Sequence, residues 1–149
     1  MAKIGIKTRV SLVMFHKNKL VVTKHDVKGY GVYYLLPGGG IEHAESPEEA
    51  IKREALEECG LEVNPGRLLW IKSGYTDEED YLDLIYLVEI KGGNFEIHEK
   101  EKMVKKIEFI GDEEELSKIK FFPKQIADKI FKELPKKTEY LGKFKYPEE

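Results

Sequence analysis

The chain has 149 residues, 41% of them hydrophobic, so we expect residues 1–149 to form one globular domain with a sizeable core. Its formal net charge of −3, with lysines and glutamates interspersed, gives no reason to expect stable binding to nucleic acid. The sequence has no membrane-spanning apolar run, no secretory signal and a single cysteine, which excludes an internal disulfide and indicates a cytoplasmic protein.

Three strands are predicted at the start of the chain. Their apolar runs occupy residues 10–15, 20–24 and 32–36, with a turn at 17–19 and a glycine-containing loop at 26–31. Tyr30, Tyr33 and Tyr34 cluster around the third strand, and one of them is a candidate to stack on a nucleobase. We assign this substrate contact to Tyr34; the alternative for each tyrosine is a half-buried position in the strand.

A helix is predicted over residues 47–59, with clear start and stop signals. Ser46 is a favoured N-cap residue, and Pro47 suits the first turn because no amide partner is needed there. Glu49, three residues after Ser46, completes a capping box. Gly60 is a good terminator, since glycine readily adopts the left-handed conformation that ends many helices.

The predicted helix has one acidic side. At about 100° per residue, Glu54, Glu57 and Glu58 fall within one arc. The neighbouring arc is apolar and should face the core, through Ile51, Ala55, Leu56 and Cys59. Like charges three or four residues apart cost roughly 0.2–0.5 kcal/mol per pair, and a bound divalent cation removes that repulsion. Oxygen ligands favour Mg²⁺, with Mn²⁺ as a substitute; the alternative is a solvated acidic helix face.

The string from Gly39 to Leu61 resembles the Nudix box, G-x5-E-x7-R-E-U-x-E-E-x-G-U, where U is a bulky apolar residue. Five residues separate Gly39 from Glu45, and seven more separate Glu45 from Arg53. Every fixed position is filled, and the small Ala55 at the first U position is a soft departure. So many fixed positions at fixed spacing disfavour the solvated-face interpretation. The chain therefore resembles the MutT-like Nudix hydrolases.

The resemblance implies metal-binding and supporting roles for residues of the box. In Nudix hydrolases the glutamates that match Glu54, Glu57 and Glu58 bind the divalent ions. The residue that matches Glu45 supports the metal site, and the arginine that matches Arg53 pairs with a nearby glutamate. These five residues are therefore the expected catalytic set, with Mg²⁺ as the expected cofactor.

Two further parts of the chain are expected at the site. Gly38, Gly39 and Gly40 allow a tight turn and close approach of a substrate, and Gly39 is also expected beside the metal. Nudix enzymes often add a distant glutamate, from a loop between late strands, as a metal ligand or general base. Glu99 and Glu101 lie where that residue would come from, and the alternative for each is a mixed-charge surface loop.

The rest of the chain predicts more strands and two helices. Strands are expected at 61–63, 68–71, 81–90, 95–97 and 104–110, with turns at 64–66 and 91–94 and an acidic hairpin tip at 76–80. A short helix is expected over 112–116, and a longer one over 123–134, where apolar residues follow helical spacing. The tail at 135–149 is either loose or folded over a neighbour, and a homodimer is compatible with the sequence without being established by it.

This order of elements predicts a mixed α/β fold with helices flanking a central mixed sheet, and the resemblance implies an α/β/α sandwich. The implied reaction is Mg²⁺-dependent hydrolysis of the pyrophosphate bond in a nucleoside diphosphate linked to another group: ADP-ribose, a nucleotide sugar or a dinucleoside polyphosphate. The alternatives are a nucleoside triphosphate pyrophosphohydrolase and a non-catalytic nucleotide-binding module, which the intact box glutamates disfavour. An RNA-cap-directed hydrolase should show a more basic surface stripe.

Overall fold

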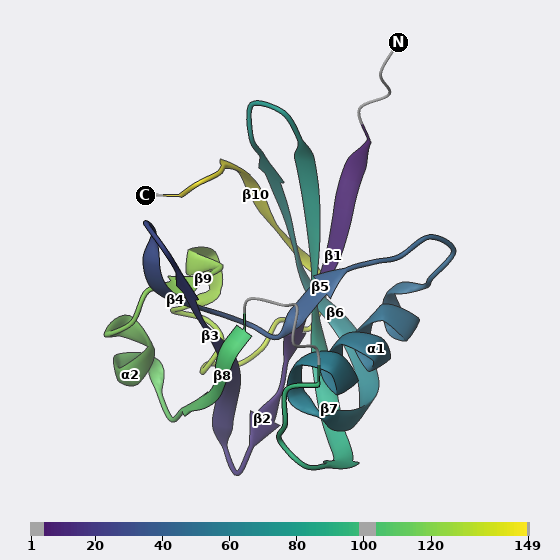
Figure 1. Ribbon diagram of the computed structural model, residues 1–149, viewed down its shortest axis with the longest axis vertical. Helices are drawn as coiled ribbons and strands as arrows, with labels where there is room; N and C mark the ends of the chain where they lie inside the picture. Colours follow the sequence, from purple (N-terminus) through teal and green to yellow (C-terminus); the bar gives the residue numbers. More distant parts are fainter. Residues whose placement is uncertain (1–4, 99–103, 149) are drawn as a thin grey trace.

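Two β-sheets organise the chain. The computed structural model describes residues 5–98 and 104–148 (Figure 1). The first sheet consists of β1 (Ile6–Val13), β5 (Gly38–Gly40), β6 (Leu61–Tyr75), β7 (Asp80–Gly93) and β10 (Glu139–Lys145). Its strand order is β10-β6-β7-β1-β5, and it is mixed, because β1 runs parallel to β7 and β10 parallel to β6 while the other pairs are antiparallel. The strand predicted over 81–90 forms as part of β7, which lies in the middle of this sheet.

The second sheet is built from shorter strands. They are β2 (Phe15–His16), β3 (Lys19–Val27), β4 (Gly31–Leu35), β8 (Val104–Ile110) and β9 (Phe121–Phe122). β3 pairs antiparallel with β2, β4 and β8, and β9 adds to β4 in parallel. The predicted early hairpin and the predicted strand at 104–110 are therefore confirmed.

The box helix forms where the sequence predicts it. α1 spans Pro47–Cys59, and the Ser46 hydroxyl accepts a hydrogen bond from the Glu49 amide at 3.1 Å. Gly60 ends the helix with a left-handed φ of 72°. A second helix, α2 (Glu113–Ser117), also agrees with the sequence prediction.

Two hydrophobic clusters lie on opposite faces of the first sheet. One lies between this sheet and α1, and the other lies between the sheet and the second sheet with α2 (Figure 1). Alternation along β1 divides its residues between them: Val10 and Leu12 belong to the cluster with α1, and Val13 belongs to the other. The mixed sheet and the fold class predicted from the sequence are confirmed, although a sheet rather than a second long helix covers most of the far face.

The apolar arc of α1 is narrower than predicted. Ile51, Ala55 and Cys59 are fully buried, as expected from a spacing of four residues. Leu56 was expected to face the core, but the side chain is 55% exposed. Because Leu56 is rotated by about 100° from Ala55, it lies beyond the strip that packs on the sheet.

The prediction of a long helix over residues 123–134 is wrong. Only a single 3₁₀ turn forms there, η1 (Lys124–Ile126), and the following residues make further turns. Ile126 and Ile130 are nevertheless buried in the second cluster. The helical spacing of the apolar residues therefore reflects two points of burial along irregular backbone, where hydrogen bonds mostly join residues three apart.

Three further boundaries differ from the sequence prediction. The expected turn at 64–66 is a bulge within the continuous strand β6, marked by a register shift between Pro65 and Leu68. β7 continues through the expected turn as far as Gly93, and residues 95–97 form no strand. The tail is not loose over its described part, because β10 pairs with β6 along residues 139–145. In the described part of the chain, no helix is long and apolar enough to cross a membrane.

Candidate active site

The carboxylate of Glu54 lies directly over β5 (Gly38–Gly40), the glycine strand. Its side chain is 2% exposed, enclosed between α1 and β5. A Cβ atom added at Gly39 would lie 2.4 Å from Glu54 Oε1, closer than any real contact of this kind. Gly39 must therefore be a glycine for the Glu54 carboxylate to occupy this position.

Glu58 ties the same helix to the same strand. Its Oε1 accepts a hydrogen bond of 2.6 Å from the amide of Gly38, and the residue is 4% exposed. A charge-assisted bond to a backbone amide is among the stronger hydrogen bonds in proteins. The carboxylates of Glu54 and Glu58 together fix the distance between α1 and the glycine strand.

Arg53 gathers the remaining carboxylates around one guanidinium group. Its Nε and Nη2 donate to the two oxygens of Glu45, both at 2.8 Å, in a bidentate pair. Its Nη1 donates to Glu54 Oε1 at 2.8 Å and to Glu57 Oε2 at 3.3 Å. A further bond of 2.8 Å reaches the carbonyl oxygen of Gly40. One arginine thus connects the loop, the helix and the glycine strand.

These contacts change the acidity of the groups involved. The hydrogen bonds from Arg53, followed by the one from the Glu42 amide, lower the pKa of Glu45 to about 2. Burial raises the pKa of the Cys59 thiol, and the nearby Glu58 and Glu54 act in the same direction. Cys59 is therefore an inert thiol, buried on the core side of the helix where the sequence predicts it.

We expect Arg53→Lys to raise the pKa of Glu45 from about 2 toward its ordinary value, because lysine cannot form the bidentate pair. A lowered carboxyl pKa adds stability above the ordinary value, near 4.5, and this stability is lost as the pH falls toward 2. The unfolding free energies of wild type and variant should therefore converge over that range. Titration of Glu45 by NMR and urea unfolding at several pH values measure both effects.

Lys52→Gln is the matched control for Arg53→Lys. Lys52 is the exposed neighbour on the same helix turn, and its loss should leave the pKa of Glu45 unchanged. An equal change in both variants would mean that the general charge of the helix, rather than the Arg53 hydrogen bonds, sets the acidity of Glu45.

The donor atoms at this end of the molecule suit a hard divalent cation. All are carboxylate oxygens, which favour Mg²⁺ or Mn²⁺ over zinc. Glu57 is 30% exposed, so solvent reaches the site on this side. Over residues 5–98 and 104–148, no three His, Cys, Asp or Glu side chains stand together as a ready metal site, and Arg53 lies among the box carboxylates. The box residues therefore fit the ion in the chemical type of their donor atoms.

The two candidate glutamates in the late loop, Glu99 and Glu101, lie outside the described residues. The chain leading to them is described up to His98, whose amide donates to the carbonyl oxygen of Glu57 at 2.8 Å. The amide of Glu96 likewise donates to the carbonyl oxygen of Cys59 at 2.8 Å. This segment therefore reaches the last turn of the box helix.

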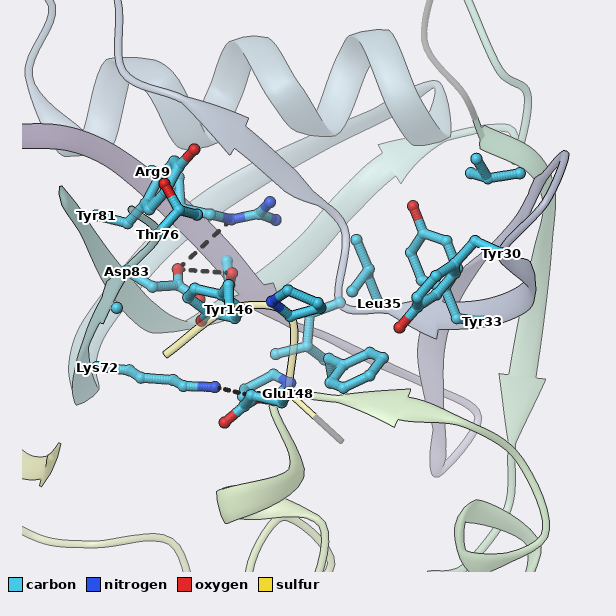
Figure 2. A pocket seen from close by; sticks show the side chains of 17 residues that line it. Arg9, Tyr30, Tyr33, Leu35, Lys72, Thr76, Tyr81, Asp83, Tyr146 and Glu148 are labelled. Carbon is cyan, nitrogen blue, oxygen red and sulfur yellow. Dashed lines mark hydrogen bonds and ion pairs between the residues drawn. The ribbon is translucent and has the colours of Figure 1, made fainter. Parts of the chain in front are cut away.

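A cavity of about 640 Å³ lies across β1 from the box helix (Figure 2). Arg9 and Ser11 line it, and in the strand register they stand opposite Gly40 and Gly38. The intervening residue, Val10, points into the core under α1. The cavity therefore lies beside the glycine strand, on the face opposite the helix. Its other lining residues are Val27, Tyr30, Tyr33, Leu35, Leu36, Lys72, Gly74, Thr76, Tyr81, Asp83, Phe122, Pro123, Tyr146, Pro147 and Glu148.

One side of the cavity is charged. Asp83 accepts a hydrogen bond of 2.8 Å from the Ser11 hydroxyl, and the Nε of Arg9 lies 3.7 Å away (Figure 2). Burial raises the pKa of Asp83, against the opposing effects of Arg9 and the Ser11 hydrogen bond. The Nε of Arg9 is buried and donates no hydrogen bond to a described residue.

The opposite side of the cavity is aromatic. Tyr30 and Tyr33 line it (Figure 2). The Tyr33 ring stacks on His25, with 5.0 Å between the ring centres and an angle of 11° between the planes. Burial lowers the pKa of His25 to about 4, so this imidazole is neutral at pH 7. Tyr34, the predicted substrate contact, does not line the cavity, because it packs against the second hydrophobic cluster from the other face of β4.

The sequence reasoning found the box but not the cavity. Its polar lining, including Arg9, Lys72, Asp83 and Glu148, belongs to no motif. The sequence feature that could have indicated the cavity is the presence of polar residues within apolar strands, such as Ser11 between Val10 and Leu12.

The sequence profile of the NUDIX domain matches residues 5–142. The chain belongs to the NUDIX family. The family predicted from the box is thus confirmed.

Individual relatives cover the chain to different extents. The curated RNA pyrophosphohydrolase of Hamiltonella defensa subsp. Acyrthosiphon pisum (strain 5AT) is 41% identical over 66 residues, 44% of this chain and only 39% of the relative. A solved ADP-ribose pyrophosphatase from Streptococcus suis 89-1591 is 18% identical, with a TM-score of 0.67, over 91% of this chain and 99% of the other. A NUDIX hydrolase from Nitrosomonas europaea is 16% identical, with a TM-score of 0.72, over 95% and 81%. These solved structures share the fold of this NUDIX domain.

Proposed function

We propose that this NUDIX protein uses Mg²⁺ to hydrolyse the pyrophosphate bond of a nucleoside diphosphate linked to another group. The observation that carries the proposal is the position of β5, which has the box carboxylates on one face and a cavity with an aromatic wall beside the other. The cavity is of the size that holds a small organic ligand. A nucleoside in the cavity would place its phosphates toward the glycine strand and the end of α1 that carries Glu54, Glu57 and Glu58.

Each box residue has a proposed role. Glu54, Glu57 and Glu58 would hold the divalent ion beside Gly39, and when bound the ion would offset the diphosphate charge and polarise its oxygens. Arg53, held by Glu45, orients the Glu54 and Glu57 carboxylates. Gly40, at the exposed end of the strand, leaves its backbone open to a phosphate group. Gly38 is buried, and its amide donates to Glu58.

Hydrolysis requires a group that accepts a proton from water, and glutamates of this chain are the proposed acceptors. A box glutamate, or Glu99 or Glu101, accepts a proton from the attacking water. The water oxygen forms a bond to one phosphorus, the bond from that phosphorus to the bridging oxygen breaks, and the other phosphate leaves. The approach of residues 96–98 to the last turn of α1 supports a contribution from the late loop.

The nucleobase contact is assigned to Tyr33, in place of Tyr34. Tyr33 lines the cavity and is held flat by His25, so its ring offers a rigid stacking surface. A base between this wall and the opposite side of the cavity would lie beside the Arg9–Asp83 pair. The substrate classes remain ADP-ribose, a nucleotide sugar or a dinucleoside polyphosphate, with nucleoside triphosphates second. A cytoplasmic location and a homodimer stay predictions.

We expect hydrolysis of one substrate class from a panel in the presence of Mg²⁺, and none after chelation with EDTA. The panel contains ADP-ribose, nucleotide sugars, diadenosine polyphosphates, nucleoside triphosphates and a 5′-triphosphorylated RNA, with phosphate release and product chromatography as readouts. A single preferred class would support the proposal and name the substrate. Preference for the RNA would instead match the activity named for the Hamiltonella relative. Silence from folded protein with both Mg²⁺ and Mn²⁺ would overturn the proposal.

A further inference from the structure

The C-terminal end of the chain forms part of the cavity wall. Beyond β10, the amide of Tyr146 donates to the carbonyl oxygen of Tyr75 at 2.8 Å, which continues the pairing with β6. The Tyr146 ring covers Gly74 so closely that an added Cβ there would lie 2.0 Å from the ring carbon Cε2. Residues 146–148 all line the cavity (Figure 2). The segment is thus fitted into the wall by a glycine that leaves room for it.

The last described residue neutralises a buried cation. Lys72 is 1% exposed, and its Nζ lies 2.9 Å from Glu148 Oε2. Glu148 is itself 9% exposed, and its Oε1 accepts a hydrogen bond of 2.8 Å from Gln125 Nε2. The Lys72 ammonium also lies 5.1 Å from the centres of the Phe144 and Tyr146 rings. Three side chains of the C-terminal segment therefore surround one lysine.

The ion pair is better explained by the cavity than by stability. A buried ion pair is often no more stabilising than apolar residues of similar volume, since both charges lose their water. Here the two partners line the cavity and face the aromatic wall (Figure 2). Among the described residues, the charged side chains that line it form two opposite pairs, Arg9 with Asp83 and Lys72 with Glu148. Glu148 therefore balances the charge of Lys72 at its end of the cavity.

We propose that Glu148 is a specificity residue: by pairing with Lys72 it keeps this end of the cavity neutral, so the cavity admits an uncharged ring system and excludes phosphate. This inference rests on the proposed function, because it concerns which part of the substrate enters the cavity. The excluded phosphates are then left for the acidic end of α1, where a divalent ion would bind them. Without Glu148, the buried Lys72 would attract an anion into the part of the cavity that the base would occupy.

The test compares wild type with Glu148→Gln, which keeps the shape and the Gln125 contact but removes the charge. Binding of inorganic phosphate and of the four common ribonucleosides is measured by NMR in EDTA, so that the box contributes no metal. We expect wild type to bind a nucleoside and to bind phosphate weakly, and the variant to bind phosphate about tenfold more tightly or better. Glu113→Gln, which removes an exposed carboxylate paired with Lys132, is the control and should behave as wild type.

A second variant separates the charge effect from a loss of packing. In the double variant Lys72→Met with Glu148→Gln both charges are gone, so tight phosphate binding should disappear while nucleoside binding is retained. Equal phosphate affinity in wild type and Glu148→Gln would overturn the inference, as would phosphate binding that survives in the double variant. Because these measurements need no turnover, they judge the inference separately from hydrolysis of the substrate panel, which judges the proposed function.

Discussion

Glu57→Gln is expected to lower the turnover number of Mg²⁺-dependent hydrolysis by roughly 100-fold to 10,000-fold while the protein stays folded. Glu57 is the most exposed of the three box carboxylates on α1, and it touches Arg53 at the long distance of 3.3 Å. Its removal therefore disturbs packing little. The change takes one negative charge and one ionic oxygen from the proposed metal site, and glutamine is a much poorer ligand and base. Steady-state kinetics against Mg²⁺ concentration measure the effect.

The matched control for Glu57→Gln is Glu49→Gln on the first turn of the same helix. Glu49 is exposed, and its side chain has no place in the proposed site. The control should retain wild-type turnover, and circular dichroism should show both variants folded. Undiminished metal-dependent activity in Glu57→Gln would contradict the catalytic arrangement proposed here, whichever glutamate acts as the base.

The box was predictable because its information is local. Ser46, Pro47 and Gly60 set the limits of the helix through backbone chemistry that needs no tertiary contact. Glu54, Glu57 and Glu58 then follow from helical geometry. What the sequence could not supply was their burial: Glu54 and Glu58 are enclosed by the glycine strand, whereas a helix pattern alone suggests solvated carboxylates.

The cavity was not predictable because its residues come together only through sheet topology. Arg9, Lys72 and Asp83 lie on β1, β6 and β7, and Glu148 follows β10. Their proximity depends on two parallel pairings between strands far apart in the sequence. The tyrosines of β4 show the same limit at smaller scale, because a change of one residue exchanges the two faces of a strand. Tyr33 therefore lines the cavity, and the neighbouring position packs in the core.

The late part of the chain misled the prediction for a related reason. Apolar residues spaced three and four apart after Pro123 favour a helix in isolation. In the fold, the preceding pair Phe121–Phe122 is held as β9 against β4, and the chain must then cross toward β10. Burial of Ile126 and Ile130 is achieved by turns instead.

Alanine substitutions along the glycine strand should give three different results. At Gly38 an added Cβ would lie 2.0 Å from the carbonyl oxygen of Val10, a backbone atom of the paired strand. The strands would have to separate, so Gly38→Ala should lower the free energy of unfolding by about 3 kcal/mol or more. At Gly40 an added Cβ would lie 3.9 Å from the carbonyl oxygen of Thr8, an ordinary contact, so Gly40→Ala should be nearly neutral and serves as the control.

Gly39→Ala should instead separate activity from stability. The added methyl group would meet the carboxylate of Glu54, the end of a side chain that can rotate, rather than backbone. Rotation of the Glu54 side chain would relieve this clash at a cost of about 1–2 kcal/mol in the free energy of unfolding. The same rotation would move a proposed metal ligand. Hydrolysis should therefore fall about tenfold or more, with a higher Mg²⁺ requirement, in protein that unfolds only slightly earlier in urea. Parallel losses in Gly39→Ala and Gly40→Ala would show that strand flexibility matters here, and an active Gly39→Ala would remove Glu54 from the proposed metal site.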